Sequence, residues 1–600
     1  MHSVPERLAA LRRALDRHGL THYLVPSTDE HLNEYVPAWG QRRTWLSGFT
    51  GSAGDLLVGR VPEETRLFTD GRYHLQAEEE LAGSGIALEK VGAPGGRTLR
   101  EALAELARRH GKACAVGCDP KVLGAETFAS LEKALRAGGA ALKRVEPNLV
   151  DELWHTRPSP PKAPLYRCPP EWTGRSAEEK VAELLSALER PGADALAAVR
   201  LDQIAWLTNL RGEGDVPFSP VFEAFAFIDA DGVQLFLRAP ETRLPGRVGG
   251  LRVHDYGEFL PFLRRRARGR VLVDPKATTQ AVVDALTDNP STQAVSAANP
   301  VDELKAVKNP AEQLAMARAG LGASAALTRA LLWLEDRLRA GTRITERAFR
   351  GRLESFYAQA EGFRGLSFPT IAATGAHGAI VHYAGADDTE LRPGELFLVD
   401  SGIHAAGGTS DITRTVIVGA PTEEQRRVYT RVLQGHLAAA RLVFPAGTPG
   451  AALDAIARAP LWAERLHYEH GTGHGVGAFL NVHEGPFTLA EARGRPQAAY
   501  GLRAGMITSV EPGYYRANFG GVRLENLYLL SDAGESEDGR RWLGLTPLTW
   551  VPFDRRLIDR ERLCPAERGW LDDYHRECLE RLSPLLSAEE RARLAESLEG

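Results

Sequence analysis

The stretch GELFLVDSGIHAAGGTSDITRTVIVG, residues 394–419, has two strand-like runs on either side of the small, turn-prone segment AAGG. Apolar and β-branched runs that flank a short glycine-containing turn are typical of a β-hairpin. Asp400 and Asp411 stand almost symmetrically about Ala405 and Ala406, so the hairpin places the two carboxylates roughly opposite each other on one face. The sequence therefore predicts a strand pair that presents two acids at one point.

A second stretch, ITSVEPGYYRANFGGVRLENLYLL at 507–530, repeats this arrangement, with Glu511 and Glu525 symmetric about Asn518 in the turn RANFGG. Like charges opposite each other on neighbouring strands cost up to about 1 kcal/mol per pair. Solvated acids on two ordinary hairpins are the alternative, but the neighbouring residues predict buried strands, where carboxylates need cations or hydrogen bonds. Two such pairs therefore predict bound cations. The apolar neighbours are Phe397, Leu398, Val399, Ile507, Val510 and Leu527.

The segment HGTGHGVGAFLNVHEGP, residues 470–486, places three histidines among many glycines. Glycine is costly where order is needed, so such a loop usually approaches something closely, and here we expect that to be metal and substrate. With His474, the four acids form an oxygen-rich set without a thiolate. This set suits two divalent cations, Mn²⁺ first, with Co²⁺, Zn²⁺ or Fe²⁺ as alternatives. Two such ions lower the pKa of a bridging water and polarise a carbonyl, which predicts a hydrolase.

The composition excludes several other classes of protein. The 600 residues carry a formal net charge of −5 with no basic block, so we expect no nucleic-acid partner. No apolar run approaches the ~20 residues that span a bilayer, and the N-terminal charged helix has no signal-peptide pattern. The five cysteines fit no zinc spacing and are expected to be reduced. These features predict a cytoplasmic protein.

An internal echo suggests the domain plan. NLVDELWHTRPSPP begins at Asn148 and NPVDELKAVKNPAEQ begins at Asn299, each after a region of alternating strands and helices. Two similar α/β modules are therefore expected, followed by two long helices at 311–338 and 345–362 and then by strand-rich sequence. The expected class is α/β (α+β). The predicted domains are 1–157 and 158–305 for the modules, 306–545 for the catalytic domain and 546–600 for a C-terminal extension.

The five candidate ligands stand in the order and contexts of the metal ligands of the pita-bread metallopeptidases, and the chain most resembles their long, three-domain Xaa-Pro aminopeptidases of cytosolic type. The modules then correspond to creatinase-N-like domains and the catalytic domain to the pita-bread fold. The resemblance runs in order over nearly the whole chain. The matching motifs are YLVPSTDEHLNEY, RRTWLSGFTGSAG, LDQIAWLTNLRGEGDVPFSPVF, FPTIAATGAHGAIVHYAG, VDSG…TSDITRT, HGTGHGVGAFLNVHEGP, EPGYY, VRLEN, LTPLTWVPFDRRLID and WLDDYH.

The resemblance implies a reaction and roles for further residues. The expected substrates are peptides with proline in second position, cut before that proline by a hydroxide that bridges two metal ions, in a homodimeric enzyme. His382 would contact the substrate, His483 would hold the scissile carbonyl oxygen, and His470 would line the proline pocket. Glu511 would also move a proton, and Arg523 would orient the carboxylates. The implied metal ligands are Asp400, Asp411, His474, Glu511 and Glu525.

Some positions depart from the family pattern. His377, the small AAGG tip and the GG pair at 520–521 are unusual, whereas His404 beside the Asp400 strand is expected to be incidental.

Other members of the fold family suggest alternative functions. The main alternative is a prolidase for X-Pro dipeptides, which the two additional modules disfavour. A creatinase-like C–N hydrolase and a catalytically inactive pita-bread binding module are further alternatives, both of which normally lack the full ligand set.

Overall fold

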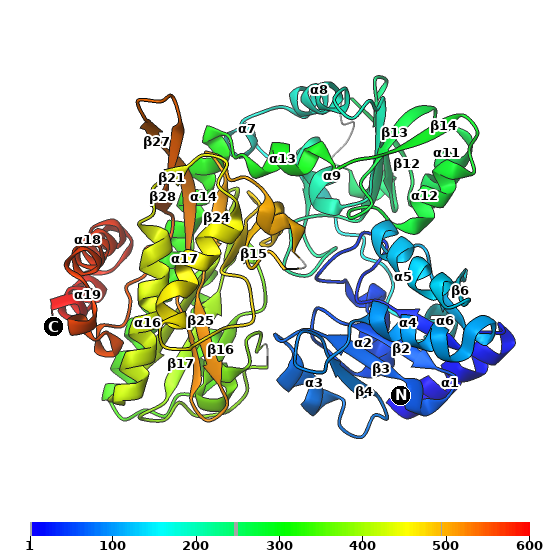
Figure 1. The fold of residues 1–600 in the computed structure, drawn as a ribbon. Helices are drawn as coiled ribbons and strands as arrows, with labels where there is room; N and C mark the ends of the chain where they lie inside the picture. The colour runs from blue at the N-terminus through cyan, green and yellow to red at the C-terminus, as the bar shows by residue number, and fades with distance from the viewer. Residues whose placement is uncertain (1–2, 245–249, 384, 494, 600) are drawn as a thin grey trace. The chain divides into compact units, whose positions relative to one another are not determined.

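The computed structural model describes residues 3–244, 250–383, 385–493 and 495–599 (Figure 1). The chain divides into two compact units. The first comprises Met1–Arg167, Arg175–Pro217 and Val221–Val301, and the second comprises Cys168–Gly174, Phe218–Pro220 and Asp302–Gly600. Two short internal segments of the second predicted module, together with its last four residues, therefore belong to the second unit.

The first module is a six-stranded sheet in the order β4-β3-β2-β1-β5-β6. Its buried central strand β1 (His22–Val25) is antiparallel to β2 (Asp55–Gly59) and parallel to β5 (Ala115–Cys118). Helix α1 (Val4–Arg17) packs with Tyr23 on one face of the sheet. On the other face, α4 and α5 pack with Leu24, because successive strand residues point to opposite sides. The remaining elements are α2 (Arg42–Ser47), β3 (Arg66–Thr69), α3 (His74–Glu80), β4 (Ala87–Lys90), α4 (Leu99–His110), α5 (Ala125–Ala137), β6 (Ala141–Arg144) and α6 (Leu149–Leu153).

The second module repeats this topology in the order β12-β11-β10-β8-β13-β14. Its central β8 (Ala195–Ala198) is antiparallel to β10 (Ala224–Asp229) and parallel to β13 (Gly269–Val273). The pairing directions match those of the first sheet at every position, which confirms two α/β modules of one kind. The remaining elements are β7 (Leu165–Arg167), α8 (Ala177–Leu188), α9 (Leu201–Thr208), β9 (Leu210–Gly212), β11 (Gly232–Leu237), α10 (Pro240–Arg243), β12 (Leu251–Asp255), α11 (Phe259–Arg265), α12 (Gln280–Thr287) and β14 (Thr292–Ser296).

The echoed segments form equivalent short helices, α6 and α13 (Pro300–Ala306). The side chain of Asn148 accepts a hydrogen bond from the amide of Val150 at 3.0 Å, and Asn299 accepts one from the amide of Val301 at the same distance. Each asparagine therefore satisfies an amide at the start of its helix that would otherwise have no partner. The two segments are similar in sequence because each contains the same helix-capping arrangement.

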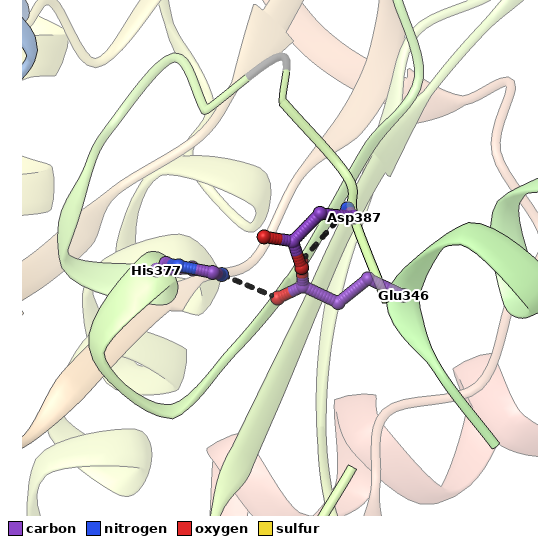
Figure 2. Close-up of side chains that lie close together, drawn as sticks. All are labelled: Glu346, His377 and Asp387. Carbon is purple, nitrogen blue, oxygen red and sulfur yellow. Dashed lines mark hydrogen bonds and ion pairs between the residues drawn. The ribbon is translucent and has the colours of Figure 1, made fainter. Parts of the chain in front are cut away.

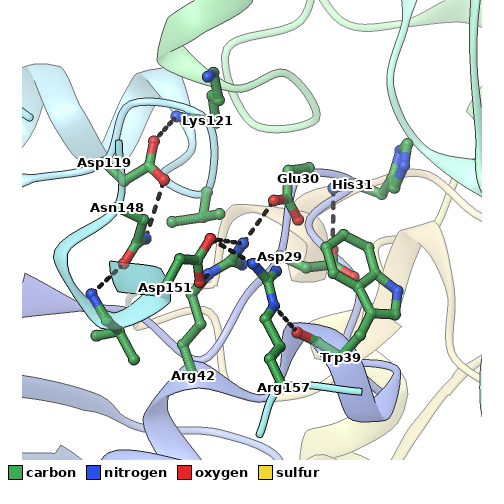
Figure 3. Close-up of polar contacts among 12 residues, drawn as sticks. Asp29, Glu30, His31, Trp39, Arg42, Asp119, Lys121, Asn148, Asp151 and Arg157 are labelled. Atoms are coloured by element: carbon green, nitrogen blue, oxygen red, sulfur yellow. Dashed lines mark hydrogen bonds and ion pairs between the residues drawn. The ribbon is translucent and has the colours of Figure 1, made fainter. Parts of the chain in front are cut away.

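A buried polar cluster lies in the first unit (Figure 3). Arg42 donates to Asp151 at 2.7 Å and to Glu30 at 2.8 Å, and its side chain is 4% exposed. His31 from the first module contacts the carbonyl oxygen of Val199 in the second module at 2.9 Å. Buried charges are tolerated only when paired in this way. This polar cluster joins the two modules within the first unit.

The second unit has a six-stranded sheet in the order β21-β28-β27-β24-β22-β23 and three-stranded sheets β16-β17-β20 and β15-β18-β19, with β25 paired to β26. Together with the helices described below, these strands form the pita-bread domain. Its strands are β15 (Phe363–Leu366), β16 (Ile371–Thr374), β17 (Leu396–Ser401), β18 (Ile403–Ala405), β19 (Gly408–Thr409), β20 (Ile412–Ile417), β21 (Phe444–Pro445), β22 (Gly473–Gly475), β23 (Glu484–Leu489), β24 (Ile507–Val510), β25 (Gly513–Arg516), β26 (Gly520–Arg523), β27 (Asn526–Glu535) and β28 (Arg541–Pro547).

The two long predicted helices are confirmed as α14 (Pro310–Arg339) and α15 (Glu346–Tyr357). Asn309 caps α14 with a capping box and Pro310 fills its first turn, so the sequence itself fixes where this helix begins. In Figure 1, α16 (Glu423–Ala440) and α17 (Gly450–Trp462) lie side by side. The unit also contains α7 (Pro170–Thr173), α18 (Pro565–Leu582) and α19 (Ala588–Glu599). Within the described residues, no helix combines the length and apolar character needed to cross a membrane.

Candidate metal centre

The first predicted hairpin is confirmed, and it carries Asp400 and Asp411. β17 and β20 pair antiparallel with Asp400 opposite Thr413, and the chain reverses at Ala406, which has a φ of 47°. Asp411 precedes β20 by one position, so the two acids lie diagonally across the pair and not directly opposite each other. Diagonal neighbours on one face are about 7–8 Å apart at the backbone. That separation leaves room for an ion between the carboxylates.

The second hairpin is also confirmed. β24 pairs with β27 so that Val510 lies opposite Asn526, and β25 pairs with β26 so that Gly513 lies opposite Arg523. Glu511 and Glu525 follow the same register and face each other between the two paired stretches. The apolar neighbours of the four acids are all buried, as predicted: Phe397, Leu398, Val399, Ile507, Val510 and Leu527.

His474 on β22 completes the cluster. Its Nε2 atom lies 3.5 Å from Asp411 Oδ2 and 3.5 Å from Glu511 Oε1, while its Nδ1 atom lies 3.0 Å from the carbonyl oxygen of Gly475. A backbone carbonyl at one ring nitrogen fixes the proton there and leaves the other nitrogen available as a ligand. Ligand atoms of Asp411, His474 and Glu525 all lie within 4.8 Å of one another.

The acids raise one another's pKa values. Burial raises the pKa of Asp400 to about 6. The positive charge of Arg523 acts to lower this pKa, and the negative charge of Asp411 acts to raise it. Burial raises the pKa of Glu511 to about 7, and burial with three neighbouring acids raises the pKa of Glu525 well above its ordinary range. A cluster whose members resist ionisation is stabilised by added positive charge.

His474 responds in the opposite direction. Burial acts to lower its pKa, but the hydrogen bond with Asp411 and the charge of Glu511 outweigh burial and raise the pKa to about 9. One oxygen of Asp400 lacks a partner: its buried Oδ1 atom has no well-formed hydrogen bond to any residue in the described part of the chain. Oxygen-rich donors, one imidazole and an unsatisfied carboxylate oxygen fit divalent cations.

Arg523 connects the acids to the surrounding residues. Its guanidinium donates to Asp400 Oδ2 at 2.6 Å, to the hydroxyl of Tyr515 at 2.7 Å and to the carbonyl oxygen of Val381 at 3.3 Å. Its side chain is 2% exposed. Thr413 supports the opposite acid by donating to Glu525 Oε2 at 2.7 Å. These contacts fix the orientation of two carboxylates before any ion binds.

The remaining candidate histidines lie around this cluster. The His483 ring is 4.5 Å from that of His474 between centroids, at an interplanar angle of 88°. His470 is buried, its Nε2 atom lies 2.8 Å from the Tyr515 hydroxyl, and burial lowers its pKa well below the ordinary value. His382 follows Val381, whose carbonyl Arg523 holds, and its charge contributes to the lowered pKa of His470.

Sequence reasoning missed Tyr515 among the residues of the site and gave His404 no structural role. Tyr515 stands four positions after Glu511 in EPGYY, and a tyrosine so close to a candidate ligand was the available signal. His404 is buried, and its ring nitrogens lie 3.1 Å from the hydroxyl of Thr409 and 3.0 Å from the carbonyl oxygen of Phe218. It anchors the segment Phe218–Pro220 to the hairpin.

Comparisons with known proteins place nearly the whole chain among Xaa-Pro aminopeptidases. Residues 315–532 match metallopeptidase family M24, residues 541–597 match its C-terminal region, and residues 7–153 and 156–312 match two creatinase/prolidase N-terminal domain families. A probable Xaa-Pro aminopeptidase P of Laccaria bicolor is 37% identical over 98% of this chain and 92% of its own. Aminopeptidase P2 of Arabidopsis thaliana is 36% identical over 97% of this chain and 86% of its own.

A solved structure gives the same result in three dimensions. The X-prolyl aminopeptidase of Caenorhabditis elegans, described as a cytosolic enzyme with a di-nuclear active site, superimposes with a TM-score of 0.93 at 31% identity over 100% of both chains. A prolidase of Pyrococcus horikoshii, at 23% identity and a TM-score of 0.50, covers 63% of this chain and shares the fold alone. The full-length identity shows that the chain belongs to the Xaa-Pro aminopeptidase P family of the M24 metallopeptidases.

Proposed function

We propose that the protein is a metal-dependent aminopeptidase that hydrolyses the bond between an N-terminal residue and a following proline. The observation that carries the proposal is the convergence of four carboxylates and one imidazole from two hairpins and β22 on one buried point. The full-length likeness to Xaa-Pro aminopeptidases supports the same reaction. The site is oxygen-rich and contains no thiolate, which suits metal-assisted hydrolysis.

Five residues would hold two divalent cations. The donor set favours Mn²⁺, with Co²⁺, Zn²⁺ and Fe²⁺ as alternatives. When bound, such ions supply a water of lowered pKa and polarise the scissile carbonyl. Arg523 and Thr413 would help two of these carboxylates, Asp400 and Glu525, to hold the ions, because they already fix their orientation. The proposed ligands are Asp400, Asp411, His474, Glu511 and Glu525.

The surrounding residues would handle the peptide and its protons. Glu511 would take a proton from the attacking water and pass it towards the prolyl nitrogen. His483, beside His474, would hold the carbonyl oxygen as negative charge develops there. His382 would hold the substrate near the scissile bond. His470, kept neutral by burial, would line the pocket for the proline ring.

A proline substrate explains the need for a dedicated site. The nitrogen of an X–Pro bond carries no hydrogen, so a peptidase that recognises an N–H at that position handles the bond poorly. A pocket lined by neutral, fixed groups such as His470 and Tyr515 accepts the ring without requiring that donor. This pocket is the proposed basis of specificity.

One experiment separates this function from the prolidase alternative. Purified protein with Mn²⁺, with and without chelator, is incubated with a tripeptide X-Pro-Pro and a dipeptide X-Pro, and the products are separated by HPLC. We expect release of the N-terminal residue from the tripeptide, abolished by the chelator. Cleavage mainly of the dipeptide would identify a prolidase. No cleavage of either by metal-loaded protein would favour a non-peptide substrate or a binding function.

The proposed enzyme is a cytoplasmic homodimer with four domains, 1–157, 158–305, 306–545 and 546–600. The description of the C. elegans relative as cytosolic supports the location. The residues matched by the four families support the domain division. Analytical ultracentrifugation tests the dimer, and limited proteolysis tests the domain boundaries by the positions of the first cuts.

A further inference from the structure

A second carboxylate centre, built on Glu346, lies outside the proposed metal ligands. Glu346 is the first residue of α15 and is fully buried. Its Oε1 atom accepts a hydrogen bond from the amide of Thr374 at 2.8 Å and lies 2.9 Å from His377 Nδ1. Its Oε2 atom accepts from the hydroxyl of Tyr383 at 3.0 Å and lies 3.5 Å from the amide nitrogen of Asp387. Figure 2 shows the His377 ring pointing at this carboxylate, with Asp387 beside it.

These partners flank His382 on both sides in the sequence. Thr374 ends β16 before the loop that carries His382, and Tyr383 is the next residue after it. Asp387 lies where the chain returns to α15, with its carbonyl oxygen accepting from the amide of Arg347 at 2.9 Å. The buried Glu346 carboxylate therefore contacts the loop at both ends, at Thr374 and Asp387, and in the middle, at His377 and Tyr383.

Tyr383 transmits this restraint towards the metal cluster. Its ring stacks on His377 with centroids 4.4 Å apart and an interplanar angle of 21°. Tyr383 and Tyr515 both pack against the cluster of Ile371, Ala373 and Leu398, and Leu398 lies on β17, the strand that carries Asp400. On the other side of His382, Arg523 holds the carbonyl oxygen of Val381 at 3.3 Å. His382 thus lies between two fixed neighbours.

Glu346, His377 and Asp387 also have the composition of a small metal site, since their ligand atoms all lie within 4.8 Å of one another. The hydrogen bonds argue against that use. Both oxygens of Glu346 already accept bonds from protein donors, and Asp387 Oδ1 accepts one from the amide of Thr389 at 2.7 Å. Glu346 is fully satisfied as an anchor for the loop.

We propose that Glu346, acting through Tyr383 and His377, is a positioning residue that holds His382 in the geometry needed to contact the peptide. The inference rests on the proposed role of His382. It also gives His377, unusual in its sequence context, a place in the mechanism. A catalytic group displaced by about 1 Å costs on the order of a hundredfold in rate. A buried carboxylate with four partners limits that displacement.

A double-mutant cycle with purified, Mn²⁺-loaded enzyme tests this inference on the tripeptide substrate. Tyr383→Phe and Glu346→Gln are each made in the native background and in the His382→Ala background. We expect Tyr383→Phe to lower kcat/KM roughly tenfold to a hundredfold in the native background. In the His382→Ala background it should have no further effect, because residues that act through one another are not additive.

The matched control is Tyr429→Phe, which removes a tyrosine hydroxyl elsewhere in the second unit; this buried hydroxyl accepts a hydrogen bond from the amide of Asp554 at 3.1 Å. It should leave kcat/KM unchanged. Equal losses from Tyr383→Phe in both backgrounds, or none in the native background, would overturn the inference. An inactive native enzyme would refute the proposed function instead, whereas unchanged activity of His382→Ala alone would refute the proposed role of His382 and, with it, this inference. Metal analysis that finds one more ion in the native enzyme than in Glu346→Gln would assign a metal site and also overturn the inference.

Discussion

Single side chains at the metal cluster combine burial with like charge. Five ionisable groups, four of them acids, lie within reach of one another, and Arg523 is the cation that contacts Asp400 directly. Burial makes Asp400, Glu511 and Glu525 resist ionisation. A bound cation would therefore stabilise the ionised form of these carboxylates. Two predictions concern these individual residues.

Removing one candidate ligand should abolish turnover while leaving the fold intact. Asp411→Ala or His474→Ala removes a ligand atom, and the loss of a metal ion costs on the order of a thousandfold or more in kcat. The fold should persist because Asp411→Ala also removes a buried negative charge from a crowded set. Activity assays, circular dichroism and metal analysis check this, with Asp532→Ala on the exposed β27–β28 ribbon as the control. Full activity in either ligand variant would contradict the ligand assignment.

The stability gained from metal should depend on pH. In the folded metal-free protein the pKa values of Asp400 and Glu511 are about 6 and about 7, above their ordinary 3.8 and 4.5. The folded state therefore binds more protons than the unfolded state in this window, and stability falls as the pH rises through it. His474, with a pKa raised to about 9 from 6.5, extends the fall towards pH 9.

Bound cations compensate the ionised carboxylates, and metal binding itself releases protons. We therefore expect Mn²⁺ to raise the Tm of chelator-treated protein more at about pH 8 than at about pH 5.5. Thermal denaturation with and without Mn²⁺ at the two pH values measures this difference. An equal shift at both would show that Asp400, Glu511 and His474 do not titrate as described.

At the level of the strand, the glycines on either side of His474 also serve backbone packing. A Cβ on Gly473 would lie 2.0 Å from the carbonyl oxygen of Ser509, and a Cβ on Gly475 would lie 2.4 Å from that of Glu484. β22 runs between β23 and β24, so the glycines permit close packing of backbones.

Gly473→Ala should therefore push β22 away from β24 and displace His474. We expect a loss of about 1–3 kcal/mol in the free energy of unfolding, as for other overpacked sites, together with weaker Mn²⁺ binding. Gly569→Ala on α18 is the matched control, because a Cβ there meets no atom within 4 Å. Denaturant unfolding and metal titration measure both quantities. Unchanged metal affinity in Gly473→Ala would show that Gly473 is not needed to position His474 for metal binding.

At the scale of the whole chain, the two similar segments that begin at Asn148 and Asn299 differ in sequence at the point where the second one enters the second unit. Trp154 and Arg157 of the first copy are replaced by Lys305 and Lys308, and both lysines pair with Glu484, the residue after His483. The Lys305 and Glu484 side chains are at most 1% exposed. Breaking a buried pair leaves an uncompensated charge, so this exit helix is tied to the strand that follows His483.

The second unit also depends on chain that precedes it. Ser219 donates to Asn481 at 2.7 Å, and Trp172 packs on Phe479 with ring centroids 5.4 Å apart. Residues 302–600 expressed alone should therefore unfold at a lower temperature than the full chain and bind Mn²⁺ more weakly. Calorimetry and metal titration of both proteins check this. Equal Tm values would show that Cys168–Gly174 and Phe218–Pro220 add nothing to the second unit.

Much of the fold and the candidate site could be predicted from local patterns. Hairpin symmetry about Ala405–Ala406 and Asn518 gave the pairing of β17 with β20 and of β24 with β27, because side-chain alternation and turn chemistry are local. Contacts such as Arg523 with Val381 or Glu346 with Tyr383 could not be predicted, since their partners are far apart in the sequence. Asp400 and Asp411 lie diagonally because the register, and not the symmetry alone, fixes their offset.

By itself, the sequence determined the two α/β modules, the long helices, the two acid-bearing hairpins and the family to which the chain belongs. Each of these follows from periodicity, capping residues or motifs within a few tens of residues. Only the tertiary structure decided that Glu346 anchors the His382 loop, that His404 and two earlier segments complete the second unit, and that glycines around His474 serve strand packing. Those facts depend on burial and distance between remote segments, which no local pattern encodes.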